Sequence, residues 1–108
     1  MWIGDNEGWL SIVKHKEKQN CLLVRSRNRE HIENIFPDAE IYVNLNADYP
    51  YRSDISIINV CLTIATRILE IDYYNFKNSV KEKKYARYLN KAWGVMYDYG
   101  LKFRTSSK

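Results

Sequence analysis

Two short and mostly apolar segments in the first third of the chain are typical of β-strands. They are Trp9–Lys14, which follows Gly8, and Cys21–Arg27, and a short charged segment joins them. We therefore predict an antiparallel hairpin. Arg25 and Arg27 lie two residues apart and share one face of the second strand. Because the apolar residues take the other face, toward a helix layer, both arginines are expected on the open face of the sheet.

The middle of the chain predicts a short helix followed by two further strands. Asn28 is a favourable N-cap, and Arg29–Phe36 carries apolar residues at helical spacing up to the proline that ends it. Glu40–Leu45 alternates apolar and polar residues, and Tyr51–Ile55 follows a segment of turn residues. The fourth strand is expected to begin at an edge or after a bulge, because Pro50 precedes it.

The apolar period becomes helical from Ile57 to Glu70, directly after Ser56, a suitable N-cap. Two neighbouring rows of apolar residues run along this segment. A helix with so broad an apolar face is typical of a protein core. We therefore predict that it is the central core helix.

Aromatic and basic residues dominate the last third of the chain. Asn75 is predicted to cap a short helical turn over Phe76–Val80, and a long helix follows from Glu82 to about Tyr99, with Gly100 as its C-cap. Apolar and aromatic residues recur along the helix at steps of four and three: Tyr85, Leu89, Ala92, Met96 and Tyr99. That spacing predicts an inward stripe, and Trp93 beside it is expected to be largely buried.

The order of predicted elements is β-β-α-β-β-α-α, which is typical of an α+β fold. We predict a four-stranded sheet with its helices packed on one face. A parallel crossover through the first helix and a ferredoxin-like interleaving of the strands both remain open. Residues 1–100 are expected to form a single domain, and residues 101–108 a C-terminal tail.

Charge is distributed unevenly along the 108 residues, which carry a formal net charge of +4. From Lys77 to the end, nine lysines and arginines face two acids, which leaves +7 there and therefore −3 in the remainder. A basic C-terminal element on a slightly acidic body is a candidate surface for phosphates or for an acidic protein. A solvated helix face without a partner is the alternative.

Two groups of residues are candidate contact sites. Arginines and a tyrosine are expected together on the open face of the sheet: Arg25, Arg27, Tyr42 and Arg52. Cations at helical spacing are expected to form one basic stripe: Lys77, Lys81, Lys84, Arg87 and Lys91. Arginine beside aromatic rings stacks bases and grips phosphates, and the same mixture is enriched in protein-binding hot spots.

We consider three roles for the residues on the open face of the sheet. A protein partner is our first hypothesis, and it includes self-association as a homodimer. A nucleic acid is the second, and the basic stripe would then follow a phosphate backbone. Structural cover, by the long last helix or by a second copy of the chain, is the third.

Catalytic and metal-binding motifs are missing from the sequence. His15 and His31 have no ligand partners at a recognisable metal-site spacing, and no nucleophile elbow or phosphate-cradling glycine loop is present. We therefore expect a protein that is not an enzyme and that holds no cofactor and no metal.

Cys21 and Cys61 lie within apolar runs, which predicts buried free thiols in a reducing compartment. The first residues lack the features of a signal peptide. The most apolar stretch, Ile55–Ile71, is interrupted by polar residues and is too polar to span a bilayer. The sequence therefore predicts a cytoplasmic protein without a membrane partner.

Four short segments carry a resemblance to a known group of proteins: LSIVKH, LLVRSR, ADYPYR, and DYYNFKNSV followed by WGVMYDY. In these segments the chain resembles a family of small bacterial proteins, also found on mobile elements, for which no activity is established. The resemblance covers under half of the chain and assigns a role to no residue. Small proteins of mobile elements often block a host defence protein, as anti-CRISPR proteins do. An inhibitor of that kind is the role that the resemblance implies.

Overall fold

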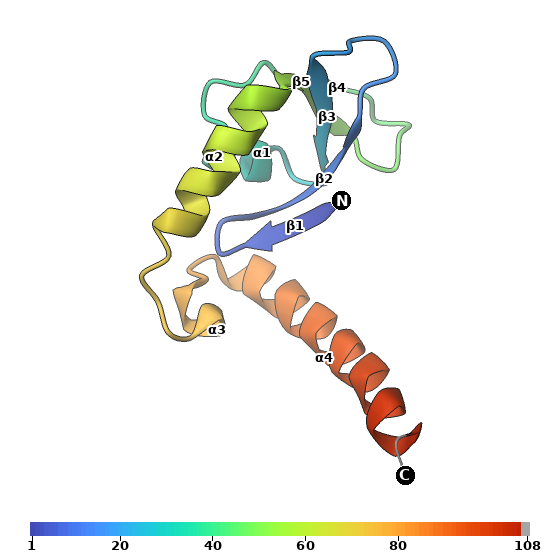
Figure 1. The fold of residues 1–108 in the computed structure, drawn as a ribbon, viewed down its shortest axis with the longest axis vertical. Coiled ribbons are helices and arrows are strands. Elements are labelled where there is room, and N and C mark those ends of the chain that lie inside the picture. The colour runs from blue at the N-terminus through green and yellow to red at the C-terminus, as the bar shows by residue number, and fades with distance from the viewer. Residues whose placement is uncertain (107–108) are drawn as a thin grey trace. The chain divides into compact units, whose positions relative to one another are not determined.

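The computed structural model describes residues 1–106, which fall into two compact units (Figure 1). The first, here called the sheet unit, spans Met1–Tyr74 and contains every strand of the described residues. The second, the helical unit, begins at Asn75. The prediction of one domain over residues 1–100 stays a prediction.

The described residues form an α+β fold with an open antiparallel sheet of five strands, not four. The strand order is β1-β2-β3-β5-β4. Every neighbouring pair is antiparallel, so the parallel crossover is wrong, and the order is not ferredoxin-like. The strands are β1 (Trp2–Asp5), β2 (Gly8–Lys14), β3 (Cys21–Ser26), β4 (Tyr42–Val43) and β5 (Tyr51–Ser56).

Sequence reasoning missed β1 because the strand is only four residues long. A tight turn joins it to β2, and the Asp5 carboxylate closes this turn by accepting hydrogen bonds from the backbone N–H groups of Glu7 (2.8 Å) and Gly8 (3.0 Å). Gly4 lies directly opposite Trp9, and a Cβ there would approach the indole ring to 2.5 Å. A larger residue at position 4 would therefore displace the Trp9 ring.

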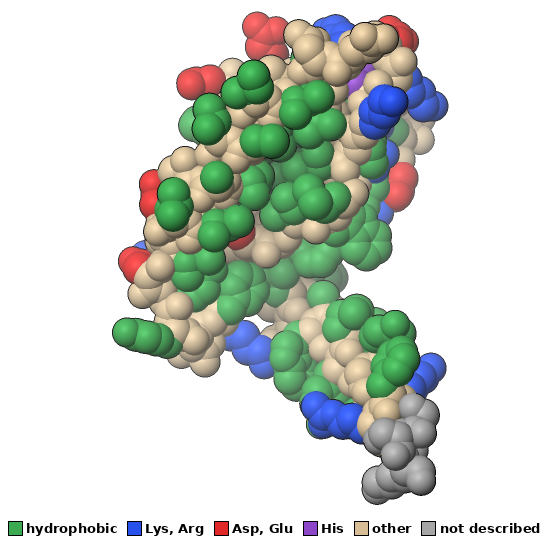
Figure 2. Space-filling model, viewed as in Figure 1, with side chains coloured by type: hydrophobic (Ala, Val, Ile, Leu, Met, Phe, Trp, Pro, Cys, Tyr) green, Lys and Arg blue, Asp and Glu red, His purple; other side chains and the backbone are tan. Residues whose placement is uncertain are grey.

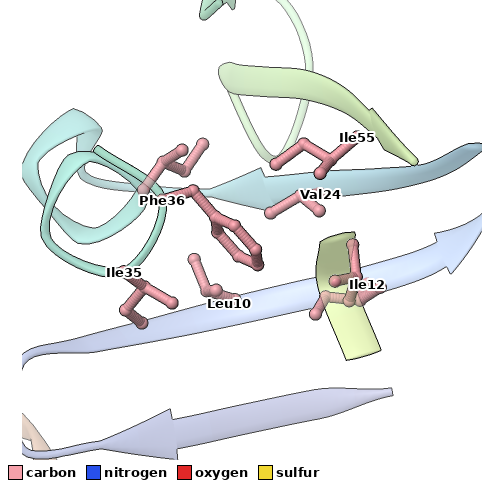
Figure 3. Close-up of a cluster of buried hydrophobic side chains, with 8 residues drawn as sticks. Leu10, Ile12, Val24, Ile35, Phe36 and Ile55 are labelled. Carbon is pink, nitrogen blue, oxygen red and sulfur yellow. The ribbon is translucent and has the colours of Figure 1, made fainter. Parts of the chain in front are cut away.

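Helices α1 (Arg29–Ile35) and α2 (Ile57–Leu69) begin at the predicted caps. The Asn28 side chain accepts a hydrogen bond from the Glu30 N–H (3.0 Å), and the Ser56 hydroxyl accepts one from Asn59 (3.1 Å). Both helices pack on one face of the sheet, and Figure 3 shows the core between the helices and the sheet. It consists of Leu10, Ile12, Val24, Ile32, Ile35, Phe36, Ile55 and Val60.

The prediction that α2 is the central core helix is wrong. Of its described residues only Val60 is buried, with Ile64 partly buried beside it. Figure 2 shows hydrophobic side chains exposed along α2, and Cys61, predicted to be buried, is exposed among them. The physical reason is that α1 and Phe36 already cover the strands near the middle of the sheet. Little apolar strand surface therefore remains for α2 to bury.

The helical unit contains α3 (Phe76–Ser79) and α4 (Lys83–Ser106). Asn75 caps α3 as predicted, by accepting a hydrogen bond from the Asn78 N–H (3.3 Å). The predicted C-cap at Gly100 is wrong, because this glycine does not have the positive φ of such a cap and the helix continues to Ser106. Residues 107–108 of the predicted tail lie outside the described residues.

The predicted inward stripe of α4 is only partly buried. Tyr85 is buried, but Met96 and Tyr99 are exposed. Trp93, expected inside, is 54% exposed. Its ring stacks on Tyr97 at a centroid distance of 5.2 Å, and the Lys77 Nζ lies 4.1 Å from its centroid. Local stacking and a cation–π contact, and not burial, hold this tryptophan.

No helix among the described residues is long and apolar enough to cross a membrane.

The burial pattern predicts a large difference between two truncations. Leu10 is fully buried in the sheet core, so Leu10→Ala should lower the free energy of unfolding by about 2–5 kcal/mol. Trp93→Ala removes only the exposed stacking on Tyr97 and the contact with Lys77, and it should cost about 1 kcal/mol. Urea denaturation followed by circular dichroism measures both values. A comparable cost at the two positions would contradict the burial described above.

Candidate protein-binding face

One row of side chains crosses all five described strands on the face opposite the helices. Direct pairing places Trp2 beside Ser11, Ser11 beside Arg25, Arg25 beside Arg52, and Arg52 beside Tyr42. Side chains alternate between the two faces of a strand, and the neighbours Leu10 and Val24 point into the core. We call the surface formed by Trp2, Trp9, Arg25, Arg27, Tyr42, Tyr49, Arg52 and Asp54 the open face.

Tyr49 organises the arginines of the open face. The ring is buried, and the Arg25 and Arg27 guanidinium carbons lie 4.7 Å and 4.2 Å from its centroid. Arg52 Nη1 donates a hydrogen bond to the backbone carbonyl of Tyr49 (3.3 Å). The sequence did not predict this central role of Tyr49. No local signal reveals it, because the contact joins β3 to the loop before β5.

Further polar contacts fix two of these arginines. Arg25 Nη2 donates to the Ser11 hydroxyl at 2.6 Å. Its buried Nε has no hydrogen-bond acceptor among residues 1–106, and the Tyr49 ring lies beside the guanidinium group. Arg27 Nη2 donates to both carboxylate oxygens of Asp48 at 3.0 Å, which raises the pKa of the guanidinium. Both guanidinium groups are therefore held in defined positions.

Asp54 anchors the other end of the open face. The Tyr42 hydroxyl donates to its Oδ1 (2.8 Å), His15 Nε2 lies 3.1 Å from the same oxygen, and Lys18 Nζ lies 3.0 Å from Oδ2. Burial by itself would raise the pKa of Asp54. The hydrogen bonds from Lys18 and Tyr42 and the nearby positive charge outweigh that effect, so its pKa lies below the ordinary value. Burial and the bond to Asp54 raise the pKa of Tyr42.

His15 has a structural role in the loop that follows β2. Its Nδ1 accepts hydrogen bonds from the backbone N–H groups of Glu17 (3.0 Å) and Lys18 (2.9 Å). Nδ1 is therefore the acceptor, and the ring proton lies on Nε2, which faces Asp54. His31 has a comparable structural role, because its Nδ1 accepts a hydrogen bond from the Trp9 N–H (3.1 Å).

Large aromatic side chains extend from the open face into solvent. Trp2 is 68% exposed, and its ring lies 6.0 Å from the ring of Trp9. Tyr42 is 46% exposed at the opposite edge strand. Within residues 1–106, no group of three His, Cys, Asp or Glu side chains could hold a metal ion. What the arrangement offers is a rigid surface for contact.

The predicted basic stripe from Lys77 to Lys91 is not one helical row. Lys77 belongs to α3, and Lys81 lies between α3 and α4. The stripe is interrupted because α3 ends at Ser79 and α4 begins only at Lys83. Of the five predicted cations, only Lys84, Arg87 and Lys91 share a face of α4.

The chain matches no family model, no curated protein and no solved structure.

The Asp54 contacts predict a specific pH dependence of stability. The pKa of Asp54 is lower in the folded chain than in the unfolded chain. Its contribution is therefore complete above the unfolded value of about 3.9 and disappears as the pH falls through the folded value. Asp54→Asn should lower the free energy of unfolding at neutral pH by about 1–3 kcal/mol. It should also weaken the loss of stability on acidification, as measured by urea denaturation at several pH values.

Asp48→Asn is the matched control on the same face. Asp48 and Arg27 form an exposed pair, with side chains 76% and 57% exposed, so its loss should cost less than about 1 kcal/mol. An Asp54→Asn variant that kept the acid sensitivity of the parent chain would show that Asp54 does not carry this effect.

Proposed function

We propose that the protein is a non-catalytic binding module whose open face docks on the surface of another protein. The observation that carries this proposal is the combination of two exposed aromatic side chains, Trp2 and Tyr42, with arginines that are already held in place. Tryptophan, tyrosine and arginine are the residues most enriched in binding hot spots. Contacts that fix these side chains beforehand reduce the entropy lost on binding.

The charge arrangement favours a protein over a nucleic acid. Asp48 neutralises Arg27, and Asp54 is paired with Lys18. A phosphate approaching the open face would therefore meet two carboxylates beside cations that are already engaged. Binding to nucleic acid depends on cations that are free to replace counterions.

The proposal includes a compartment and a biological role. A cytoplasmic location is proposed from the free thiols and the composition of the chain. The resemblance to mobile-element proteins supports a role as an inhibitor that covers a surface of a host defence protein, in the manner of anti-CRISPR proteins. Such an inhibitor would act sterically, because the chain is basic and does not mimic the charge of a nucleic acid.

Truncation of the exposed indole tests the open face. A partner is first recovered from a host lysate and purified. Trp2→Ala should weaken binding to this partner at least tenfold, which corresponds to about 1.4 kcal/mol. Tyr74→Ala is the control, because Tyr74 is fully exposed and belongs to no strand. Calorimetric titration compares the variants with the parent chain. The proposal is wrong if Trp2→Ala and Tyr42→Ala both bind as the parent does.

Nucleic-acid binding is the second candidate, and the cluster of Lys84, Arg87 and Lys91 on α4 favours it. Measuring binding to generic RNA and DNA at increasing salt concentration tests this candidate. Binding at low salt that is lost in Lys84→Glu/Arg87→Glu would support it. A chain that binds neither nucleic acid at low salt would eliminate it.

A further inference from the structure

The outward side of α2 is apolar over its whole length. Ile58, Leu62, Ile68 and Leu69 are 73%, 63%, 62% and 85% exposed. Cys61 and Ala65 are also exposed and lie between these larger side chains. We call these six residues the α2 outer face. An apolar patch of this kind on a small protein marks an interaction surface.

The orientation of α2 is fixed, so a rotation about its axis cannot hide the outer face. Val60 packs into the core on the opposite side of the helix. Near the C-terminal end, Arg67 forms ion pairs with Asp5 and with Glu7 Oε1 (2.7 Å to Nη2). Burying the outer face against its own sheet would break these ion pairs and expose Val60.

The composition of the outer face fits a second copy of this chain. None of its six residues is charged, so two identical faces meet without electrostatic repulsion. Small side chains at Cys61 and Ala65, one helical turn apart, allow the axes of two helices to approach closely. The larger side chains on either side then pack around the contact.

We propose that the protein forms a homodimer in which α2 packs against α2 of a second copy about a two-fold axis near Cys61 and Ala65. Such an interface is self-complementary, as a two-fold contact requires. The four large side chains expose on the order of 500 Å² per copy, so two copies would bury about 1,000 Å² in total, which is the lower end of the range for specific interfaces. The dimer rests on α2 alone and is independent of the open face.

A charge placed on the outer face tests the proposal. The parent chain should sediment as a dimer at micromolar concentration, and Ile58→Lys should raise the dimer dissociation constant at least tenfold. Asn59→Lys adds the same charge at the adjacent exposed position, outside the outer face, and should leave the constant unchanged. Analytical ultracentrifugation of the full-length chain measures all three, and circular dichroism checks that each variant is folded.

A cross-linking experiment identifies the interface independently of stability. In a Cys21→Ser background, a short bismaleimide should join Cys61 of one copy to Cys61 of another and give a covalent dimer. A second variant, which carries Asn59→Cys and Cys61→Ser in the same background, should still dimerise but should give little covalent dimer. A parent chain that sediments as a monomer overturns the proposal, whether or not its Cys61 reacts with the bismaleimide. A dimer that survives Ile58→Lys, or that cross-links only through position 59, also overturns it.

Discussion

The alternation of side chains along β3 is the constraint on which the sheet unit depends. This strand lies in the middle of the described sheet and pairs with β2 and β5. Val24 is fully buried on one side, so Arg25 must project from the other. A shift of one residue in either pairing would turn Arg25 into the core and Val24 into solvent, at a cost of several kcal/mol. The apolar core thus determines where the arginines of the open face lie.

Local sequence signals predicted the helices better than the sheet. The caps at Asn28, Ser56 and Asn75 are side-chain contacts over two or three residues, and all three are confirmed. The strand β1 is short and contains a glycine, and the order of the strands depends on pairing between distant residues, which an alternating pattern does not encode. The same limit explains the error at Gly100, because a glycine near the end of an apolar pattern permits a helix to end but does not oblige it to end.

The site shows the same division between local and distant information. Sequence reasoning placed Arg25, Arg52 and Tyr42 on one face, and register confirms that these three form one row. It did not predict that Tyr49 and Asp54 would organise this row, because both contact residues distant in the sequence. A buried tyrosine beside arginines and a partly buried aspartate near a histidine have no signature in a single sequence. Only the fold brings them together.

The sheet unit thus has two surfaces of different character on opposite sides. The open face is polar and aromatic, and two cations on it or beside it, Arg27 and Lys18, are paired with carboxylates. The α2 outer face is apolar and uncharged. Because α2 packs on the face of the sheet opposite the arginines, pairing of two copies through α2 would leave both open faces accessible. A dimer built in this way would present two identical sites, and its binding to a repeated or symmetric partner would be strengthened by avidity without any new contact.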